Sequence, residues 1–320
     1  MMLKAVDSVE ILSLMDNSID LLSTVNREEV KPLRSWVRER MGEDWVRKYL
    51  RYPIAEHGFS VLIRVLVGDS SHNVLFDTGI SSKGVVTNAC NMGVNLTQIE
   101  AIALSHGHYD HSGGLVETIR FINKKDLPII VHDDMFRRRG IEDLKGTIRE
   151  YPPFPSEEDV KPAKFVKTKR PYLLADGAIL VTGEIPRQTD FEKGYPQQRF
   201  YLDGKWLPDP LVLDDRALVV NLKGKGLVVI SGCAHAGIIN SVLYAKQVTG
   251  VSEVYAVMGG FHLAGKHFEA RIDKTVKMLK QLNPALVAPS HCTGWRGVFT
   301  IAKAIPDAFV WNSVGNLYQL

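Results

Sequence analysis

Three histidines and one aspartate fall within the six positions from His106 to His111, and this cluster limits what the chain can fold into more than any other feature. It directly follows the apolar run at 101–104, which predicts a short buried strand. Neutral imidazole nitrogens and carboxylate oxygens are the donors that zinc and similar first-row ions prefer. Without an ion, crowding four such groups at the end of a buried strand costs side-chain entropy and desolvation energy. We therefore interpret the cluster as a metal site rather than a histidine-rich surface turn.

The pattern His-x-His-x-Asp-His, followed by Ser112-Gly113-Gly114, resembles the signature of the metallo-β-lactamase fold superfamily. Three further segments match that superfamily: 76–79, 232–235 and 290–292. Four more resemble the branch labelled 7,8-dihydropterin-6-methyl-4-(β-D-ribofuranosyl)aminobenzene-5′-phosphate synthase, or simply metal-dependent hydrolase: 55–58, 182–187, 259–262 and 290–294. The resemblance implies an α/β fold, a four-layer αββα sandwich.

The bulk composition is that of an ordinary globular protein, with 45% hydrophobic and 23% charged residues. The net charge of +3 gives no strong field for nucleic acid or an anionic membrane. Charged side chains interrupt the first 22 residues, so we expect neither a signal peptide nor a membrane span there. The three cysteines lie far apart and do not suggest a disulfide framework. A cytoplasmic location is the expectation.

Strand and helix patterns alternate along most of the chain, and we expect one domain over 1–320. Residues 27–52 predict a helical excursion broken at Gly42, which serves as a packing surface or as the contact of a homo-oligomer. The proline-rich region 133–216 predicts an irregular cap or lid insertion. The predicted strands are 9–14, 59–67, 73–76, 101–104, 128–131, 218–222, 227–231, 253–257, 285–288 and 308–312, and the predicted helices are 113–123, 237–248 and 267–282.

The resemblance implies two divalent metal ions, with Zn²⁺ favoured and Mn²⁺ or Fe²⁺ as alternatives. It places His106 and His108 on the first ion. It places Asp110, His111 and His291 on the second, and His291 follows the predicted strand 285–288.

The rest of the ligand set departs from the superfamily pattern at Cys233, which stands where an aspartate usually bridges the two ions. A third histidine for the first ion is also missing from its usual earlier position, near Glu184. His235 is the preferred additional ligand. Cys233 is either a ligand or a small buried apolar side chain. The sequence leaves open whether Cys233, His235, Glu184 or a pair of them completes the site.

Other motif residues are candidates for supporting roles. Asp77 follows the strand 73–76 and is expected to orient a metal-bound histidine through its second ring nitrogen. His262 follows two glycines and is the candidate proton donor or anion contact, so Asp110 and His262 are the expected catalytic residues. The candidate substrate contacts are His262, Arg187, His57, His132 and Glu184.

Charge accounting indicates the class of substrate. Two divalent ions bring more positive charge than Asp110, a hydroxide and a Cys233 thiolate remove, so the site favours an anionic ligand. We therefore expect a metal-dependent hydrolase in which a metal-bound hydroxide attacks a small substrate carrying phosphate or carboxylate.

Two other functions remain open. The branch label suggests a pterin-related phosphate synthase or transferase, which would release a condensation product rather than incorporate solvent oxygen. The altered bridging position at Cys233 suggests a non-catalytic metal or ligand sensor. A nuclease is disfavoured because it needs a broad basic surface, and the basic cluster at 161–170 alone does not make one.

Overall fold

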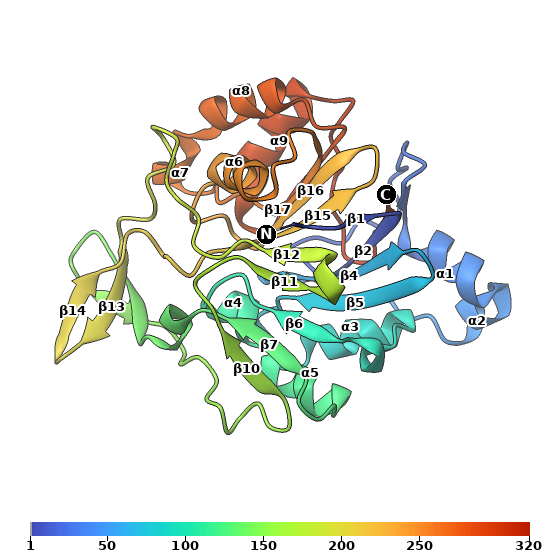
Figure 1. The fold of residues 1–320 in the computed structure, drawn as a ribbon, viewed down its shortest axis with the longest axis horizontal. Helices are drawn as coiled ribbons and strands as arrows, with labels where there is room; N and C mark the ends of the chain where they lie inside the picture. The colour runs from blue at the N-terminus through green and yellow to red at the C-terminus, as the bar shows by residue number, and fades with distance from the viewer. Residues whose placement is uncertain (1) are drawn as a thin grey trace.

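The computed structural model describes residues 2–320. Two large sheets pack face to face, and helices cover the outer face of each (Figure 1). Within residues 2–320 the strands form sheets of eight, seven and four strands. Among the same residues, no helix combines the length and apolar character needed to cross a bilayer.

The eight-stranded sheet carries the first half of the chain. Its strands, in spatial order, are β10 (Lys164–Lys167), β7 (Pro128–Val131), β6 (Ala101–Ala103), β5 (Ser70–Phe76), β4 (Ser60–Val67), β2 (Ser8–Met15), β19 (Leu317–Gln319) and β3 (Val30–Lys31). The strands β5, β6 and β7 run parallel. Because the carboxyl ends of parallel strands meet at one edge, the residues that follow β5 and β6 emerge side by side.

The seven-stranded sheet carries the second half of the chain. Its strands are β11 (Tyr172–Leu174), β12 (Ile179–Val181), β15 (Ala217–Leu222), β16 (Gly226–Ser231), β17 (Val254–Gly260) and β18 (Leu286–Ser290), with β1 (Ala5–Val6) paired to β15. Here β16, β17 and β18 are parallel, so they also end at one common edge.

Three hydrophobic clusters fill the spaces between the four layers. The alternation of strand side chains sends Ile130 into the core between the sheets, whereas Ile129 and Val131 face the helices. On the outside of the eight-stranded sheet lie α1 (Leu33–Met41), α2 (Glu43–Lys48), α3 (Gly84–Met92) and α5 (Leu115–Ile122). On the outside of the seven-stranded sheet lie α6 (Ile238–Thr249), α7 (Lys266–Glu269), α8 (Ile272–Leu282) and α9 (Gly294–Ala304). The predicted αββα sandwich is therefore confirmed.

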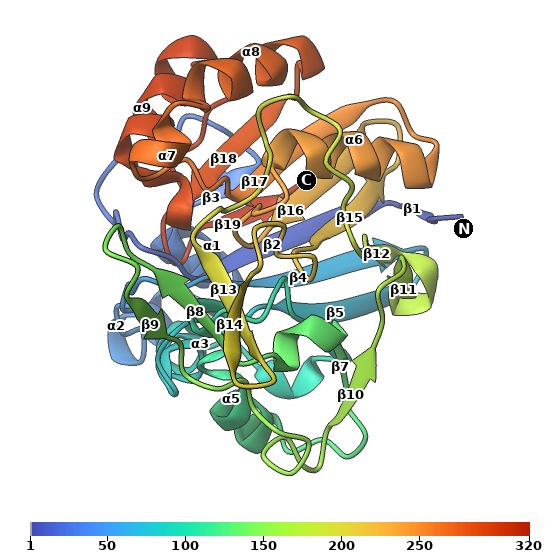
Figure 2. The ribbon, with the colours of Figure 1, turned by 90° about the vertical axis from the view of Figure 1, so that its left-hand side faces the viewer.

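The four-stranded sheet lies beside the sandwich, and β13 and β14 project from it (Figure 1). Figure 2 looks at this side and shows β13 and β14 in front of the main sheets. The strands are β14 (Lys205–Pro208), β13 (Gln198–Leu202), β8 (Arg139–Glu142) and β9 (Ile148–Glu150). We call this sheet the cap sheet.

The predicted cap over 133–216 is wider than the cap sheet. Within this region β10 pairs with β7, and β12 pairs with β15, so both belong to the main sheets. Ile179–Val181 of β12 is buried because it lies between β11 and β15, whereas the edge strand β10 is only partly buried.

Two other expectations have clear outcomes. Within the range 27–52, where we expected a helical excursion, the structure has β3 followed by α1 and α2, which meet at Gly42 with a φ of 84°. The strand predicted at 308–312 is wrong: this stretch makes one isolated bridge, between Phe309 and Val287. The last strand is instead β19, because the terminal residues pair with β2.

Short helices complete the chain. They are α4 (Tyr109–Ser112), η1 (Leu96–Gln98), η2 (Asp133–Phe136), η3 (Ala175–Gly177) and η4 (His291–Thr293). Of these, α4 and η4 carry predicted metal ligands.

Candidate metal centre

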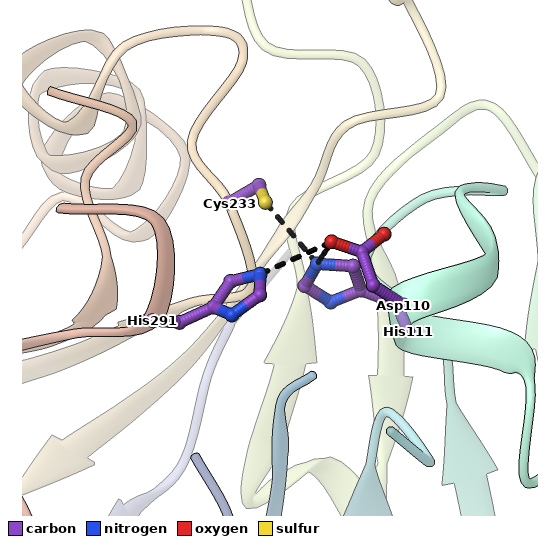
Figure 3. Close-up of side chains that lie close together, drawn as sticks. All are labelled: Asp110, His111, Cys233 and His291. Atoms are coloured by element: carbon purple, nitrogen blue, oxygen red, sulfur yellow. Dashed lines mark hydrogen bonds and ion pairs between the residues drawn. The ribbon is translucent and has the colours of Figure 1, made fainter. Parts of the chain in front are cut away.

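The predicted ligands converge where the carboxyl ends of the two main sheets face each other. The 106–111 loop follows β6, Cys233 and His235 follow β16, and His291 follows β18. Figure 3 shows Asp110 and His111 on one side, facing Cys233 and His291 on the other. Residues that are more than 100 positions apart in the sequence thus share one site.

The first donor set consists of three buried histidines. Nε2 of His235 lies 3.1 Å from Nε2 of His106 and 3.2 Å from Nδ1 of His108. Nitrogens bound tetrahedrally to one zinc ion at 2.0–2.1 Å are about 3.3 Å apart. The three nitrogens therefore fit a shared metal ion.

The second donor set surrounds the Asp110 carboxylate. Its Oδ2 lies 3.3 Å from Nε2 of His291 and 3.7 Å from Nε2 of His111. The same His111 nitrogen lies 3.1 Å from Sγ of Cys233. Four potential donor atoms, from Asp110, His111, Cys233 and His291, lie within 4.8 Å of one another.

Cys233 lies between the two sets. Its Sγ also belongs to a group with His106 and His235 in which all donor atoms lie within 4.8 Å of one another. The sulfur thus occupies the position from which one atom can bridge two ions. Of the alternatives that the sequence left open, the geometry brings Cys233 and His235 to the centre.

The second ring nitrogens of the ligands are held by polar partners, as is usual for metal-bound histidine. Nδ1 of His111 lies 2.7 Å from Oδ2 of the fully buried Asp77. The Ser105 hydroxyl donates to the same carboxylate oxygen and lies 2.9 Å from Nδ1 of His106. Nδ1 of His291 lies 3.0 Å from Oδ1 of Asn17.

Burial and neighbouring charges shift the pKa values of the donor side chains in ways that favour binding of a cation. Burial lowers the pKa of His108 to about 4, and it also lowers the pKa values of His106 and His235. These imidazoles are neutral at pH 7 and can donate lone pairs. At His111, burial lowers the pKa, but Asp110 and Asp77 outweigh it and raise the pKa to about 9. A positive charge is thus favoured beside Asp110.

Three consecutive residues, Asp214, Asp215 and Arg216, hold the backbone of the ligand loops. Oδ2 of Asp214 accepts a hydrogen bond from the N–H of Gly107 at 2.8 Å, between two ligands of the first set. Oδ2 of Asp215 accepts one from the N–H of Ala236 at 2.8 Å, and the Arg216 N–H donates to the Ser105 carbonyl at 2.9 Å. The 214–216 segment therefore fixes the spacing between loops from opposite sheets.

A cavity of about 320 Å³ opens above the donor atoms. His57, Asp110, Cys233, His262 and His291 line it, together with side chains of the cap region. A larger cavity of about 480 Å³ lies between the 20–27 loop and residues 306–316. We assign the chemistry to the smaller one, because the larger one contains none of the predicted ligands.

Two of the predicted substrate contacts reach the cavity. His262 packs against His235, with their ring centroids 4.4 Å apart. Nε2 of His57 lies 3.6 Å from Oδ2 of Asp110, and the His57 side chain is 62% exposed. Both are thus available to a molecule that enters the site.

The structure does not bring the other three predicted contacts to the cavity. Arg187 turns its guanidinium to the carbonyls of Ile185 and Leu211. Nε2 of the buried His132 lies 3.0 Å from Oε1 of Glu184. These three side chains do not line the cavity and contact neighbouring groups instead, although Nε of Arg187 has no hydrogen-bond partner among residues 2–320, so the geometry does not support them as substrate contacts here. Glu184 also belongs to none of the donor groups found among residues 2–320.

Several residues that line the cavity were not predicted from the sequence. They are Asn17, Tyr109, Ile141, Arg149, Tyr151, Tyr195, Gln198, Ala264, Phe268, Cys292 and Gly294. The most consequential is Arg149 on β9, an exposed cation whose guanidinium lies 5.5 Å from the ring of Tyr151. A hydrogen bond with Tyr109 raises the pKa of Arg149. No local motif marks Arg149, whereas Cys292 lies next to His291 in a recognised segment.

We expect Asp77→Asn to weaken metal binding about 10–100-fold, the usual effect of losing the carboxylate behind a metal-bound histidine. Asparagine keeps the shape of Asp77 but removes the charge that faces Nδ1 of His111. Competition with a chromophoric chelator measures the affinity. Asp176→Asn, at a carboxylate that is 83% exposed, is the control. Equal affinities in the two variants would contradict the assigned role of Asp77.

Known proteins are similar to this chain in sequence and fold. The family model described as the metallo-beta-lactamase superfamily matches residues 54–190. A protein of Methanocaldococcus jannaschii named 7,8-dihydropterin-6-methyl-4-(beta-D-ribofuranosyl)-aminobenzene-5'-phosphate synthase is 33% identical over 273 residues, which are 83% of this chain and 90% of that protein.

Solved structures also match this chain. Tm1679, described as a metal-dependent hydrolase of the β-lactamase superfamily, matches with a TM-score of 0.70 and 26% identity over 98% of each chain. The metallo-beta-lactamase fold protein YhfI from Bacillus subtilis matches with a TM-score of 0.53 and 13% identity, over 98% of this chain and 100% of that one, and shares the fold. The chain therefore belongs to the metallo-β-lactamase superfamily.

Proposed function

We propose that this protein is a metal-dependent hydrolase that acts on a small anionic substrate carrying phosphate or carboxylate. One observation carries the proposal: two donor sets, His106–His108–His235 and Asp110–His111–His291, lie on either side of Cys233 on the floor of an open cavity. Bound divalent ions, most simply Zn²⁺, supply Lewis acidity and lower the pKa of a bound water from about 15.7 toward about 7.

The chain's own residues position the ions and the substrate. Asp110 contributes a negative charge that burial disfavours, but His111 and His291 keep its pKa well below the ordinary value. It therefore stays ionised as a ligand. His262 lines the cavity, and its Nδ1 is buried without a hydrogen-bond partner among residues 2–320. In this proposal His262 donates a hydrogen bond or a proton to the substrate.

Arg149 takes the role of anion contact that the sequence analysis assigned to Arg187. It lies on the cap sheet at the cavity wall, where a substrate carboxylate or phosphate can reach the guanidinium. A fixed guanidinium suits both anions, because it offers paired N–H donors.

We expect Arg149→Gln to raise KM for anionic substrates about tenfold with a smaller change in kcat. The expected loss is about 1.4 kcal/mol, near the lower limit for a hydrogen bond to a charged group, since Arg149 is exposed. Arg34→Gln, an exposed arginine on α1, is the control. Steady-state kinetics on one phosphate ester and one uncharged ester give the comparison. An equal change for both esters would contradict an anion contact.

The hydrolase proposal is tested by turnover in ¹⁸O-labelled water. The metal-loaded protein is incubated with a phosphomonoester, a phosphodiester, a lactone and a thioester, and products are analysed by mass spectrometry. Incorporation of ¹⁸O into a product, lost after chelation, supports hydrolysis. Full metal occupancy without turnover of any compound counts against it and favours a sensor.

The second candidate is a synthase that joins a pterin to a ribosyl-aminobenzene phosphate. It is favoured by the 33% identity to the Methanocaldococcus jannaschii protein with that name. The two candidates differ in their products. Formation of a condensation product without ¹⁸O uptake would select the synthase.

A further inference from the structure

A third group of donors lies beside the two sets described above. The thiols of Cys233 and Cys292 and the imidazole of His262 each offer one donor atom, and these atoms all lie within 4.8 Å of one another. All three residues also line the cavity. Neither the resemblance nor the comparisons assign Cys292 a role.

Parallel strand ends bring the three residues together. Cys233 follows β16, His262 follows β17 and Cys292 follows β18, and these strands are adjacent in the sheet. Gly260 allows the close approach: a Cβ there would lie 2.7 Å from Sγ of Cys292 and 3.2 Å from Cα of Cys233. The backbone thus leaves space for the sulfur atoms at the cavity floor.

These side chains have few other partners. The Cys292 thiol donates a long hydrogen bond of 3.4 Å to the Cys233 carbonyl. Nδ1 of His262 is buried and unpaired within the described part of the chain. Cys292 is 8% exposed and Cys233 is 2% exposed, so water does not freely solvate them. Two thiols and an imidazole in a polar cavity differ from a cysteine packed as a small apolar side chain.

We propose that Cys233, Cys292 and His262 form a third, sulfur-rich metal site that binds a zinc-class ion. Two sulfurs and one imidazole nitrogen match the Cys₂His donor set of catalytic zinc sites, which leave a fourth position open. The two thiolates balance the charge of a divalent ion, and each thiol releases its proton to solvent on binding. In this proposal the Cys233 thiolate is shared between the third-site ion and one ion of the neighbouring sets, since it has lone pairs for two ions.

This site gives the metal centre softer donor atoms than histidine and aspartate alone would provide. Thiolate ligands favour zinc and other thiophilic ions over magnesium or manganese. The proposal concerns which ion binds and through which atoms, and because it shares His262 and Cys233 with the proposed function, its test measures ion stoichiometry and thiolate absorption rather than turnover. Hydrolase activity can be absent while the third site is present, and the reverse also holds.

The experiment uses the full-length protein loaded with Co²⁺, because thiolate–Co²⁺ bonds give a charge-transfer absorption that imidazole and carboxylate do not. The protein is titrated as wild type, Cys292→Ser and His262→Asn, with Cys90→Ser as the matched control. Cys90 is exposed on α3, away from the cavity. Elemental analysis after zinc loading gives the number of ions per chain, and near-UV circular dichroism checks the fold.

Wild type and Cys90→Ser are expected to bind one more ion per chain than Cys292→Ser and His262→Asn. Cys292→Ser should also lose about two thirds of the charge-transfer absorption, since both thiolate bonds to the third ion are lost and one bond from Cys233 to a neighbouring ion remains. If Cys292→Ser misfolds, His262→Asn alone decides the test through the stoichiometry. Wild type without thiolate absorption, or unchanged stoichiometry and absorption in the folded variants, would overturn the third site.

Discussion

If the protein is the hydrolase we propose, replacing His235 with alanine will reduce its activity by about 10³-fold and remove one metal ion per chain. His235 is the single member of the first donor set that comes from the second half of the chain, and its Nε2 lies within 3.2 Å of ligand nitrogens on both His106 and His108. A bound ion contributes several kcal/mol to transition-state stabilisation, and about 4 kcal/mol corresponds to about 10³ in rate.

The control for this prediction is His72→Ala. His72 lies on β5 and pairs with Glu100, its Nδ1 2.8 Å from Oε2 of Glu100, outside the cavity. Metal content and kcat/KM are measured for both variants under the same loading conditions. If His235→Ala kept the metal content of the control, the first donor set would not hold an ion as we assign it.

The second large effect concerns stability. We expect Arg139→Met to lower the free energy of unfolding by about 3–5 kcal/mol, the usual result of removing one partner from a buried ion pair. Arg139 is 4% exposed and donates to both oxygens of the fully buried Asp214, at 2.7 and 2.6 Å, and to Asp209 at 3.0 Å. Without the guanidinium, two buried carboxylates lose their positive partner.

The same substitution should also disturb the 106–111 loop, which carries predicted metal ligands. Asp214 accepts the Gly107 N–H, so displacement of its carboxylate loosens the loop between His106 and His108. Metal affinity of Arg139→Met should therefore fall together with its stability. The cap sheet, which carries Arg139 on β8, is thereby coupled to the metal centre.

The neighbouring residue provides a matched control. Arg138 pairs with Glu150 at 2.6 Å, but its side chain is 51% exposed, so solvent screens the pair. Arg138→Met should leave the urea-unfolding midpoint and the metal affinity nearly unchanged. A similar loss of stability in both variants would show that the charge of this segment matters rather than the buried pair.

Much of the fold was predictable because it depends on local patterns. Apolar runs identified strands such as β4 and β7, and the position of Gly42 identified the break between α1 and α2. The helices α3 and α9 were missed. The α3 sequence offers no acidic residue in its first turn and no side-chain cap, and α9 begins directly after the motif segment that contains His291.

The cap region was less predictable. Its strands are three to five residues long, and β13 pairs with β8 across more than 50 residues of sequence. A strand of that length carries too little alternation to be distinguished from a loop. Arg149 could not be recognised as a cavity residue for the same reason, since its placement depends on that pairing.

The sequence by itself determined that a candidate metal centre lies after β6, because His106, His108, Asp110 and His111 are neighbours whose spacing alone concentrates four donors. Only the tertiary structure decided that Cys233, His262 and Cys292 lie beside them and that Asp214 supports the loop. The physical reason is strand register: the pairs Ser231 with Gly259 and Gly260 with Ser290 set which residues leave the sheet side by side. That register follows from burial across both sheets, which no single segment contains.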